Sequence, residues 1–219
     1  TNVTLGGLTN SSPYSSNTQA SATVTNGASI NTSGVGSIGI VAQSIAGGGG
    51  LAYGATGKST LGGAPSGSNG QAVAVTSNAS ITTSGDNAFG ILAQSVGGGG
   101  GAVITNTASN TGTFGNGVGH AGAVTVNVNA AIITSGAGAH GVVAQSVAGG
   151  GGLVTNGTTT VFGGGTRGNS GVVKVVVGSG GSIKTLATGT VGIKAMSSTD
   201  PVFEIAAGAS VIGGAGGAA

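Results

Sequence analysis

Charged and aromatic side chains are scarce in this chain, and cysteine and tryptophan are absent. Without cysteine there are no disulfides, no thiolate metal sites and no thiol nucleophile. Five Lys and Arg against three Asp and Glu give a net charge of +2, too few cations for the several phosphate contacts that nucleic-acid binding needs. Aromatic residues, on which single-stranded bases stack, make up only 3%. We therefore expect no nucleic-acid partner.

Glycine dominates what is present: the 219 residues include 51 Gly and only 3 Pro. Glycine-rich chains are often disordered, but disorder usually goes with few apolar residues and a high net charge. Here hydrophobic residues reach 38% and charged residues only 4%, so a folded domain with a sizeable core is expected. No apolar run is long enough to span a bilayer, and no signal peptide is visible at Thr1.

A strict internal period of 51 residues runs along the chain. The segment GIVAQSI at 39–45 recurs at 90–96 and 141–147, each time before a run of glycines (47–50, 97–101 and 149–152), with a degraded fourth copy at 192–198. Such a period indicates stacked units that contact mainly their neighbours. The expected divisions are the end of a preceding repeat (1–19), three full repeats (20–70, 71–121 and 122–172) and a degenerate terminal repeat or cap (173–219). Because the pattern is cut at both ends, we expect a piece of a longer protein.

Each unit has the pattern of short β-strands. Small and branched residues alternate at 72–76, and β-branched residues cluster at 80–83. Residues 91–96 and 102–105 are predicted to be a third and a fourth strand, and Gly, Asn and Ser clusters separate these segments. A helical period longer than one turn is missing, so an all-β solenoid is predicted. About six strand-sized pieces per unit favour about two coils per repeat, giving roughly eight or nine coils and a rod of roughly 40 Å. Three coils per repeat is the alternative.

The fourth copy distinguishes the two faces of the strand at 39–45. One face carries Ile40, Ala42 and Ser44, and the fourth copy keeps this character. On the other face the fourth copy has Lys194 and Met196. A lysine is easily accommodated only where its amine reaches water. The Ile/Ala/Ser face is therefore predicted to face the core, and the opposite face to point outward in at least the last unit.

The opposite face forms an apolar row, here named the contact stripe. It consists of Val41, Gln43, Ile45, Leu92, Gln94, Val96, Val143, Gln145 and Val147. Because soluble proteins rarely leave such a row bare, the favoured interpretation is that the glycine runs or a neighbouring loop cover it. The alternative is a contact surface for another copy or a partner. With two coils per repeat the glutamines would lie about 9.6 Å apart, too far for a direct hydrogen bond.

The fourth unit has lost its glycine run and gained charge. Asp200 and Pro201 stand where the earlier units have glycine. Six of the eight charged residues lie late in the chain: Arg167, Lys174, Lys184, Lys194, Asp200 and Glu204. Terminal repeats of solenoids are often atypical and more polar because they protect an open end. This unit is therefore predicted to be a cap or a boundary.

Three glycine-rich segments match the short motifs of nucleotide-binding sites, but the sequence around them lacks the elements that such sites require. Residues 34–39 and 136–141 match GxGxxG, but no helix and no acidic residue follow them, so they are predicted to be solenoid corners. Residues 52–59 match a relaxed phosphate loop, but the segment that follows cannot form the required helix. No cofactor is therefore expected.

Acids and bases are too few for an enzyme to be expected. Asp86 lies about two units away from Asp200 and Glu204, so these carboxylates cannot form the pair that polysaccharide cleavage needs. His140 occupies the repeat position of Phe89 and is predicted to be a packed side chain. Repeated aspartates, which calcium-binding solenoids require, are missing. We predict no catalytic residues and no metal site.

The repeated motif resembles a known family. The pattern TSGxxxxGIxAQS(I/V)xGGGG stands at 32–50, at 83–101 and, with Val142 for Ile, at 134–152. It resembles the repeats of large bacterial autotransporter passenger regions and related surface adhesins, over about residues 20–198. The resemblance implies a right-handed parallel β-helix, export across two membranes, and display or release outside a Gram-negative cell. It also implies a carboxy-terminal outer-membrane barrel, which is not part of this chain. Most such regions are adhesive or scaffolding, and some carry enzymes.

We therefore expect a non-catalytic extracellular structural or adhesive protein, with self-association into a surface fibre as one version. Its partners would be further copies of itself, or the surface of a host cell or a neighbouring cell. Contact with a membrane is expected only through the outer-membrane barrel that the resemblance implies. The alternative is a carbohydrate- or surface-binding module that uses rows of Thr and Asn. The expected row contains residues 31–32 and 82–83, and it is interrupted by Ile133 in the third unit.

Overall fold

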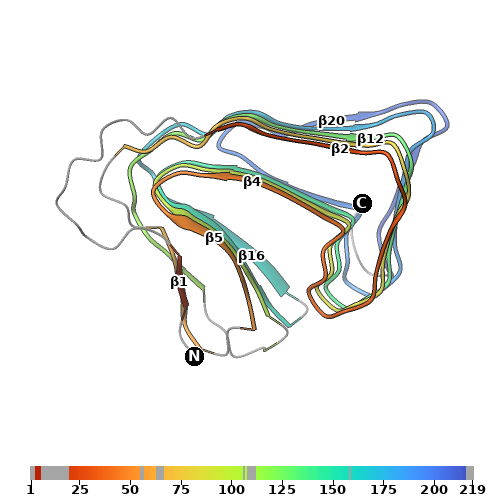
Figure 1. The fold of residues 1–219 in the computed structure, drawn as a ribbon, viewed down its shortest axis with the longest axis horizontal. Coiled ribbons are helices and arrows are strands. Elements are labelled where there is room, and N and C mark those ends of the chain that lie inside the picture. The colour runs from red at the N-terminus through yellow and green to blue at the C-terminus, as the bar shows by residue number, and fades with distance from the viewer. Residues whose placement is uncertain are drawn as a thin grey trace.

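A computed structural model describes residues 3–5, 20–54, 57–62, 67–105, 107, 112–157 and 159–215. The regular structure in these ranges is all β, with 21 strands arranged in five sheets. The strands of each sheet stack in parallel, except for one antiparallel pair at an edge. This arrangement confirms the predicted parallel β-helix (Figure 1).

Each complete repeat contributes five strands, and the first four are equivalent in all three repeats. In repeat 1 these are β2 (Ala22–Asn26), β3 (Ile30–Thr32), β4 (Ile40–Ile45), β5 (Gly49–Tyr53) and β6 (Ser59–Leu61). In repeat 2 they are β7 (Val73–Ser77), β8 (Ile81–Thr83), β9 (Ile91–Val96), β10 (Gly100–Ile104) and β11 (Gly112–Phe114). In repeat 3 they are β12 (Val124–Val128), β13 (Ala131–Thr134), β14 (Val142–Val147), β15 (Gly151–Asn156) and β16 (Thr159–Gly164).

One repeat makes one coil. Val24 pairs with Val75, and Ile40 pairs with Ile91, each one repeat further along the chain. The prediction of two coils per repeat is therefore wrong, as is the alternative of three. The longest sheets hold five strands, which corresponds to about 20 Å between the first and last strand rather than 40 Å. Counting strands misled the prediction because each coil contains a second layer of strands as well as the three sides of the helix.

Three sheets form a triangular inner helix. The first sheet is β2-β7-β12-β17-β20, the second is β3-β8-β13-β18-β21 and the third is β4-β9-β14-β19. A fourth sheet, β5-β10-β15-β16, is named here the glycine sheet, and β1 (Val3–Leu5), β6 and β11 form a small fifth sheet. Figure 1 shows the glycine sheet folded back along the outside of the third sheet.

The interior of the triangle is filled by branched and small side chains. Val75 and Val126 enter it from the first sheet, Ile81 and Ile132 from the second, and Ala93 from the third. The Ile/Ala/Ser face of the third sheet is therefore the core face, as predicted. A separate apolar layer, which includes Phe89, Leu92 and Leu153, lies between the third sheet and the glycine sheet. Alternation along each strand thus supplies both layers, because successive side chains point to opposite faces.

The glycine runs make the second layer possible. Gly47 and Gly48 turn the chain with φ of 85° at each, and Gly49 and Gly50 then extend at φ of 142° and 148°. Residues other than glycine avoid this positive-φ region, because their Cβ collides with the backbone there. A Cβ on Gly49 would also collide with the carbonyl oxygen of Gly100 in the next coil. Four consecutive glycines are therefore what this reversal requires.

The fourth unit lacks such a run and does not make the second layer. Its strands are β17 (Val173–Val177), β18 (Ser182–Thr185), β19 (Ile193–Met196), β20 (Val202–Ile205) and β21 (Ser210–Ile212). From β19 the chain passes directly to β20, where Lys174 pairs with Val202 only 28 positions later. In repeat 3, β16 turns back and pairs antiparallel with β15, and so occupies the last edge of the glycine sheet.

Candidate functional site

The contact stripe lies between the third sheet and the glycine sheet. Six of its members are buried: Leu92, Gln94, Val96, Val143, Gln145 and Val147. At the first coil, Gln43 and Ile45 are half-buried, and Val41 is 37% exposed. The favoured interpretation is confirmed for these six, because the glycine runs carry β10 and β15 across them. The alternative of a contact surface for a partner is corrected at these six positions, which form an internal layer in coils two and three.

The three glutamines form a ladder along the axis of the helix. Gln43 Nε2 donates to Gln94 Oε1 at 2.8 Å, and Gln94 Nε2 donates to Gln145 Oε1 at 2.5 Å. This corrects the expected spacing of about 9.6 Å, because one coil per repeat places these residues on adjacent strands, about 4.8 Å apart. Buried amides need such partners, since an unpaired one costs about 1–3 kcal/mol.

The glutamines also join the two layers. Gln94 Nε2 donates to the carbonyl oxygen of Gly101 at 3.1 Å, and Gln145 Nε2 to that of Gly152 at 2.8 Å. The ladder ends at Met196, whose sulfur lies 3.6 Å from Gln145 Nε2. Gln94 and Gln145 therefore fix both the register between coils and the position of the glycine sheet. An amide is suited to this role because it carries both a donor and an acceptor.

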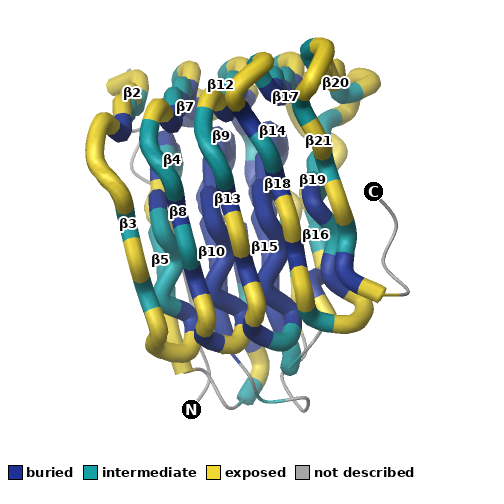
Figure 2. Tube along the Cα trace, turned by 90° about the vertical axis from the view of Figure 1, so that its right-hand side faces the viewer, coloured by how far each residue is buried: buried dark blue, intermediate teal, exposed yellow. Residues whose placement is uncertain are grey.

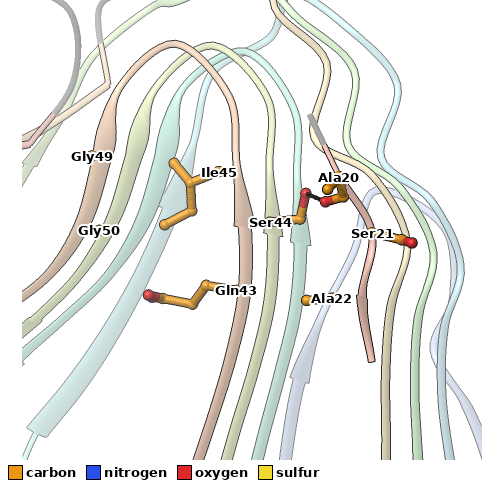
Figure 3. A pocket seen from close by; sticks show the side chains of 8 residues that line it. All are labelled: Ala20, Ser21, Ala22, Gln43, Ser44, Ile45, Gly49 and Gly50. Atoms are coloured by element: carbon orange, nitrogen blue, oxygen red, sulfur yellow. Dashed lines mark hydrogen bonds between the residues drawn. The ribbon is translucent and has the colours of Figure 1, made fainter. Parts of the chain in front are cut away.

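A second ladder, made by serines, closes the seam between the third sheet and the start of each coil. Ser95 Oγ donates to the carbonyl oxygen of Gln71 and accepts from the Gly122 amide, both at 2.8 Å. Ser44 and Ser146 make the same pair of bonds one coil away on either side. Figure 3 shows Ser44 pointing toward Ala20 while Gln43 and Ile45 point to the other side of β4. Every serine thus bridges two successive coils.

His140 is packed in the second layer, as predicted, and is 3% exposed. Its ring stacks on Phe89, with centroids 5.7 Å apart. Nδ1 accepts from the Val191 amide at 3.1 Å, so the ring proton lies on Nε2, which faces Thr160 Oγ1 at 3.2 Å. Burial, with a smaller contribution from the charge of Lys194, lowers the pKa of His140 to about 4. The imidazole is therefore neutral near pH 7 and acts as a structural group.

Lys194 faces β16, the strand that also contains Thr160. Its Nζ donates to the carbonyl oxygen of Thr160 at 2.9 Å and lies 5.5 Å from the ring centre of Phe162. Burial lowers the pKa of this amine. In the sequence, Lys194 served to assign the outward face. In the structure this lysine is half-buried beside β16, and the Thr160 carbonyl and the Phe162 ring take the place of part of the hydration shell of its amine.

Several other polar and charged side chains near the surface also make structural contacts. Asp86 Oδ1 accepts from the Ala137 amide at 2.9 Å, and Lys174 pairs with Glu204 at 2.6 Å. His120 Nδ1 accepts from the Asn169 amide at 3.0 Å. Within the described ranges, His, Asp and Glu nowhere form a group of three that could hold a metal ion. The described residues also contain no helix with the length and apolarity of a membrane span.

The GxGxxG segments are corners of the helix. Residues 34–39 and 136–141 connect the second sheet to the third, with Gly36 at φ of 67° and Gly138 at 66°. Asn87 takes the same position in the second coil at φ of 53°. The segment at 52–59 begins at the end of β5 and lies partly outside the described residues. None of these turns leads into a helix, as a phosphate site requires.

The expected row of Thr and Asn is not a flat surface row. Thr83 and Thr134 are buried, and their hydroxyls donate to the carbonyl oxygens of Ala88 and Ala139 at 2.5 and 2.6 Å. In each repeat only the first residue of the expected pair points outward. Across the sheet these first residues are Asn31, Thr82, Ile133 and Lys184, so the row is not uniformly polar. The prediction failed because alternation turns the second residue of each pair toward the corner.

A second polar face lies on the outside of the first sheet, with Ala74 between Thr23 and Thr125 in one of its rows. Its residues are Thr23, Thr25, Thr76, Thr125 and Asn127, which are exposed or half-buried. Asn127 Nδ2 lies 3.4 Å from Thr76 Oγ1 across adjacent strands. This surface, named here the first-sheet face, was missed in the sequence, although the alternation of polar and branched residues at 22–26 and 124–128 could have revealed it.

Comparisons with protein-family models, curated proteins and solved structures gave no match.

Proposed function

We propose that this chain is a non-catalytic structural and adhesive module of a protein displayed or released outside a Gram-negative cell. The observation that carries the proposal is the use of the repeated polar residues. Gln94 and Ser95 each bond to the neighbouring coils rather than converge with other groups on a cavity. Residues that repeat once per coil and bind the next coil build a rod, and its surface is then free to make contacts.

The ladders support a rod of defined register. A one-residue slip in a parallel sheet would move every apolar side chain to the wrong face, and it would also break both ladders. A buried polar network whose groups are hydrogen-bonded makes a core rigid and specifies one packing arrangement. Asn129 Nδ2 donates to Asn78 Oδ1 at 2.9 Å on the outside, which adds a third ladder position. Such a rod can hold a binding surface at a distance from its anchor.

The non-enzymatic part of the proposal is supported by what the titratable groups do. Glu204 is engaged with Lys174, and Asp86 caps a corner. The neutral nitrogen of His140 that could take a proton is instead an acceptor for a backbone amide. General acid–base chemistry needs such a group within reach of a substrate, and here that atom is turned into the protein.

The first-sheet face is the contact surface that this proposal assigns. Threonine and asparagine side chains from three neighbouring strands present hydroxyl and amide groups on one face of a sheet, at the spacing of the strands. Such groups both donate and accept hydrogen bonds, which suits the hydroxyls of a glycan. Recognition of a polysaccharide on a cell surface is therefore the chemistry proposed for adhesion.

Two matched variants test the proposal. Thr125→Glu alters the first-sheet face, and Ile133→Glu places the same side chain on the second sheet. Both positions lie next to a lysine in the following coil, Lys174 and Lys184, so the fold can accommodate the charge at both. Beads coated with each protein are tested for binding to immobilised bacterial and host polysaccharides. We expect Thr125→Glu to weaken bead binding several-fold and Ile133→Glu to leave it unchanged. Equal binding by both variants, or no binding by the parent protein, would overturn the adhesive assignment.

A further inference from the structure

β16 is anchored to the second layer by one buried residue. Thr160 is 6% exposed, whereas the other residues of the strand are half-buried or exposed, and Val161 is 42% exposed. Figure 2 shows the contrast with β15, the buried strand against which β16 lies. Ordering a strand costs conformational entropy, and one buried side chain offsets little of that cost. β16 therefore depends on the contacts that Thr160 makes.

Two basic side chains hold Thr160 from different parts of the helix. Its hydroxyl lies 3.2 Å from Nε2 of His140, in the corner before β14. Its carbonyl oxygen accepts from Nζ of Lys194, on β19, at 2.9 Å. The same amine lies 5.5 Å from the ring centre of Phe162. Together with the β15–β16 ladder, these contacts keep β16 closed over the second layer.

The arrangement requires a neutral imidazole. Nδ1 of His140 accepts from the Val191 amide at 3.1 Å, so a proton on Nδ1 would bring two N–H groups face to face. Burial, and to a smaller extent the charge of Lys194, disfavour the protonated ring and lower the pKa of His140 to about 4. A protonated ring would place two cations beside the same residue, Thr160.

The elements packed around the ring offer it no anion among the described residues. β15, β16 and the corner at Val191 have no titratable side chain, and β19 contributes only Lys194. The corner that carries Phe89 includes Asp86, but this side chain is exposed and its Oδ1 accepts from the Ala137 amide. A protonated ring is therefore stabilised only when water reaches it.

Water can reach the ring most easily where β16 lies. Phe89 is fully buried and stacks on one face of the ring. The corner at Val191 is bonded to coil three: the Val191 carbonyl accepts from the Gly141 amide at 3.2 Å, and the next carbonyl accepts from the Val142 amide at 2.8 Å. β16 has a sheet neighbour on one side only, so it can move without breaking the stack of coils.

We propose that β16 is an acid-released strap: it closes the last edge of the second layer while His140 is neutral, and it opens when a second proton binds to this imidazole. Opening uncovers the free edge of β15 and the apolar layer against which Phe162 packs, while the stacked coils stay folded. The inference goes beyond the proposed function and does not depend on the adhesive face.

Hydrogen exchange of the 219-residue protein at pH 7 and pH 4, referred to the rates of an unstructured chain at each pH, tests the inference. The Gly165 amide donates to the Gly150 carbonyl, so alternation along the strand turns the amides of Gly163 and Val161 toward β15 as well. An opening that restores the ordinary pKa of His140 should lower the protection of these two amides roughly a hundredfold between pH 7 and pH 4. Low urea concentrations should leave their exchange unchanged, because a local opening exposes little surface.

A reference amide and two variants complete the test. The Val124 amide, which donates to the Val172 carbonyl in the first sheet, should exchange only by global unfolding and so depend strongly on urea. In His140→Phe, the protection of β16 should change less than about threefold with pH. Lys194→Met should speed exchange at β16 at both pH values but keep most of the pH effect, because burial is the larger cause of the lowered pKa of His140.

Three results would each overturn the inference. The first is an equal pH effect on β16 in the parent protein and in His140→Phe. The second is loss of the pH effect in Lys194→Met. The third is exchange at β16 that follows the Val124 amide at every urea concentration, because β16 would then open only when the whole helix unfolds.

Discussion

Acid should destabilise the fold through His140. The pKa of this imidazole is lowered from 6.5 to about 4 in the folded protein, chiefly by burial and then by the charge of Lys194. Because the folded pKa is the lower one, the stabilising contribution is fully present above pH 6.5 and is lost as the pH falls toward 4. At 1.36 kcal/mol per pKa unit, the loss is about 3 kcal/mol, a large part of an ordinary domain stability.

The assay is urea unfolding of the parent protein and of His140→Phe at pH 7 and pH 4. Phenylalanine occupies the same repeat position at Phe89, so the second layer can accommodate it. We expect the parent to lose about 3 kcal/mol more than the variant between the two pH values. The variant should itself be somewhat less stable at pH 7, because the Val191 amide and the Thr160 hydroxyl lose their partner. Identical pH dependence of the two proteins would refute the reasoning.

Two further substitutions test the ladder and the glycine sheet by urea unfolding. Gln94→Leu should cost about 1–3 kcal/mol because it leaves buried amide and carbonyl groups unpaired, and Gln43→Leu should cost less because that site is half-buried. Equal losses at the two sites would contradict this. Gly100→Ala should cost more than 3 kcal/mol, since φ is 133° and the new methyl group meets the Gly151 carbonyl. Gly27→Ala, where the added carbon meets nothing within 4 Å, is the control and should change stability by less than about 1 kcal/mol.

The layer structure was largely predictable from particular substitutions in the repeat. Lys194 and Met196 identified which face of the third sheet is the core face. A cover over the opposite face was expected from either the glycine runs or a neighbouring loop, since an apolar row is rarely left bare. The structure shows that the glycine runs provide it, because only glycine tolerates both the turn and the close approach to the next coil. His140 was correctly expected to be packed, since its position is otherwise held by apolar residues.

The number of coils per repeat was not predictable from these signals. A period of 51 residues and a set of short strands are compatible with one, two or three coils, because the local sequence does not determine which strands pair with one another. The direct contact between Gln43 and Gln94 follows only once the coil count is known. The β15–β16 hairpin was also missed, because its residues have no counterpart in the other repeats that would show a change of strand direction.

The central claim is that one repeat is one coil, with the repeated polar residues serving contact between coils. Because the chain has no native cysteine, an Asn31→Cys and Thr82→Cys double variant gives a direct test. Adjacent strands place these positions about 4.8 Å apart, within the range of a disulfide. We predict a rapid intramolecular disulfide on oxidation, and none for Asn31→Cys with Ile133→Cys, which lie about 9.6 Å apart. Failure of the first pair to close, with the protein folded, would contradict the account.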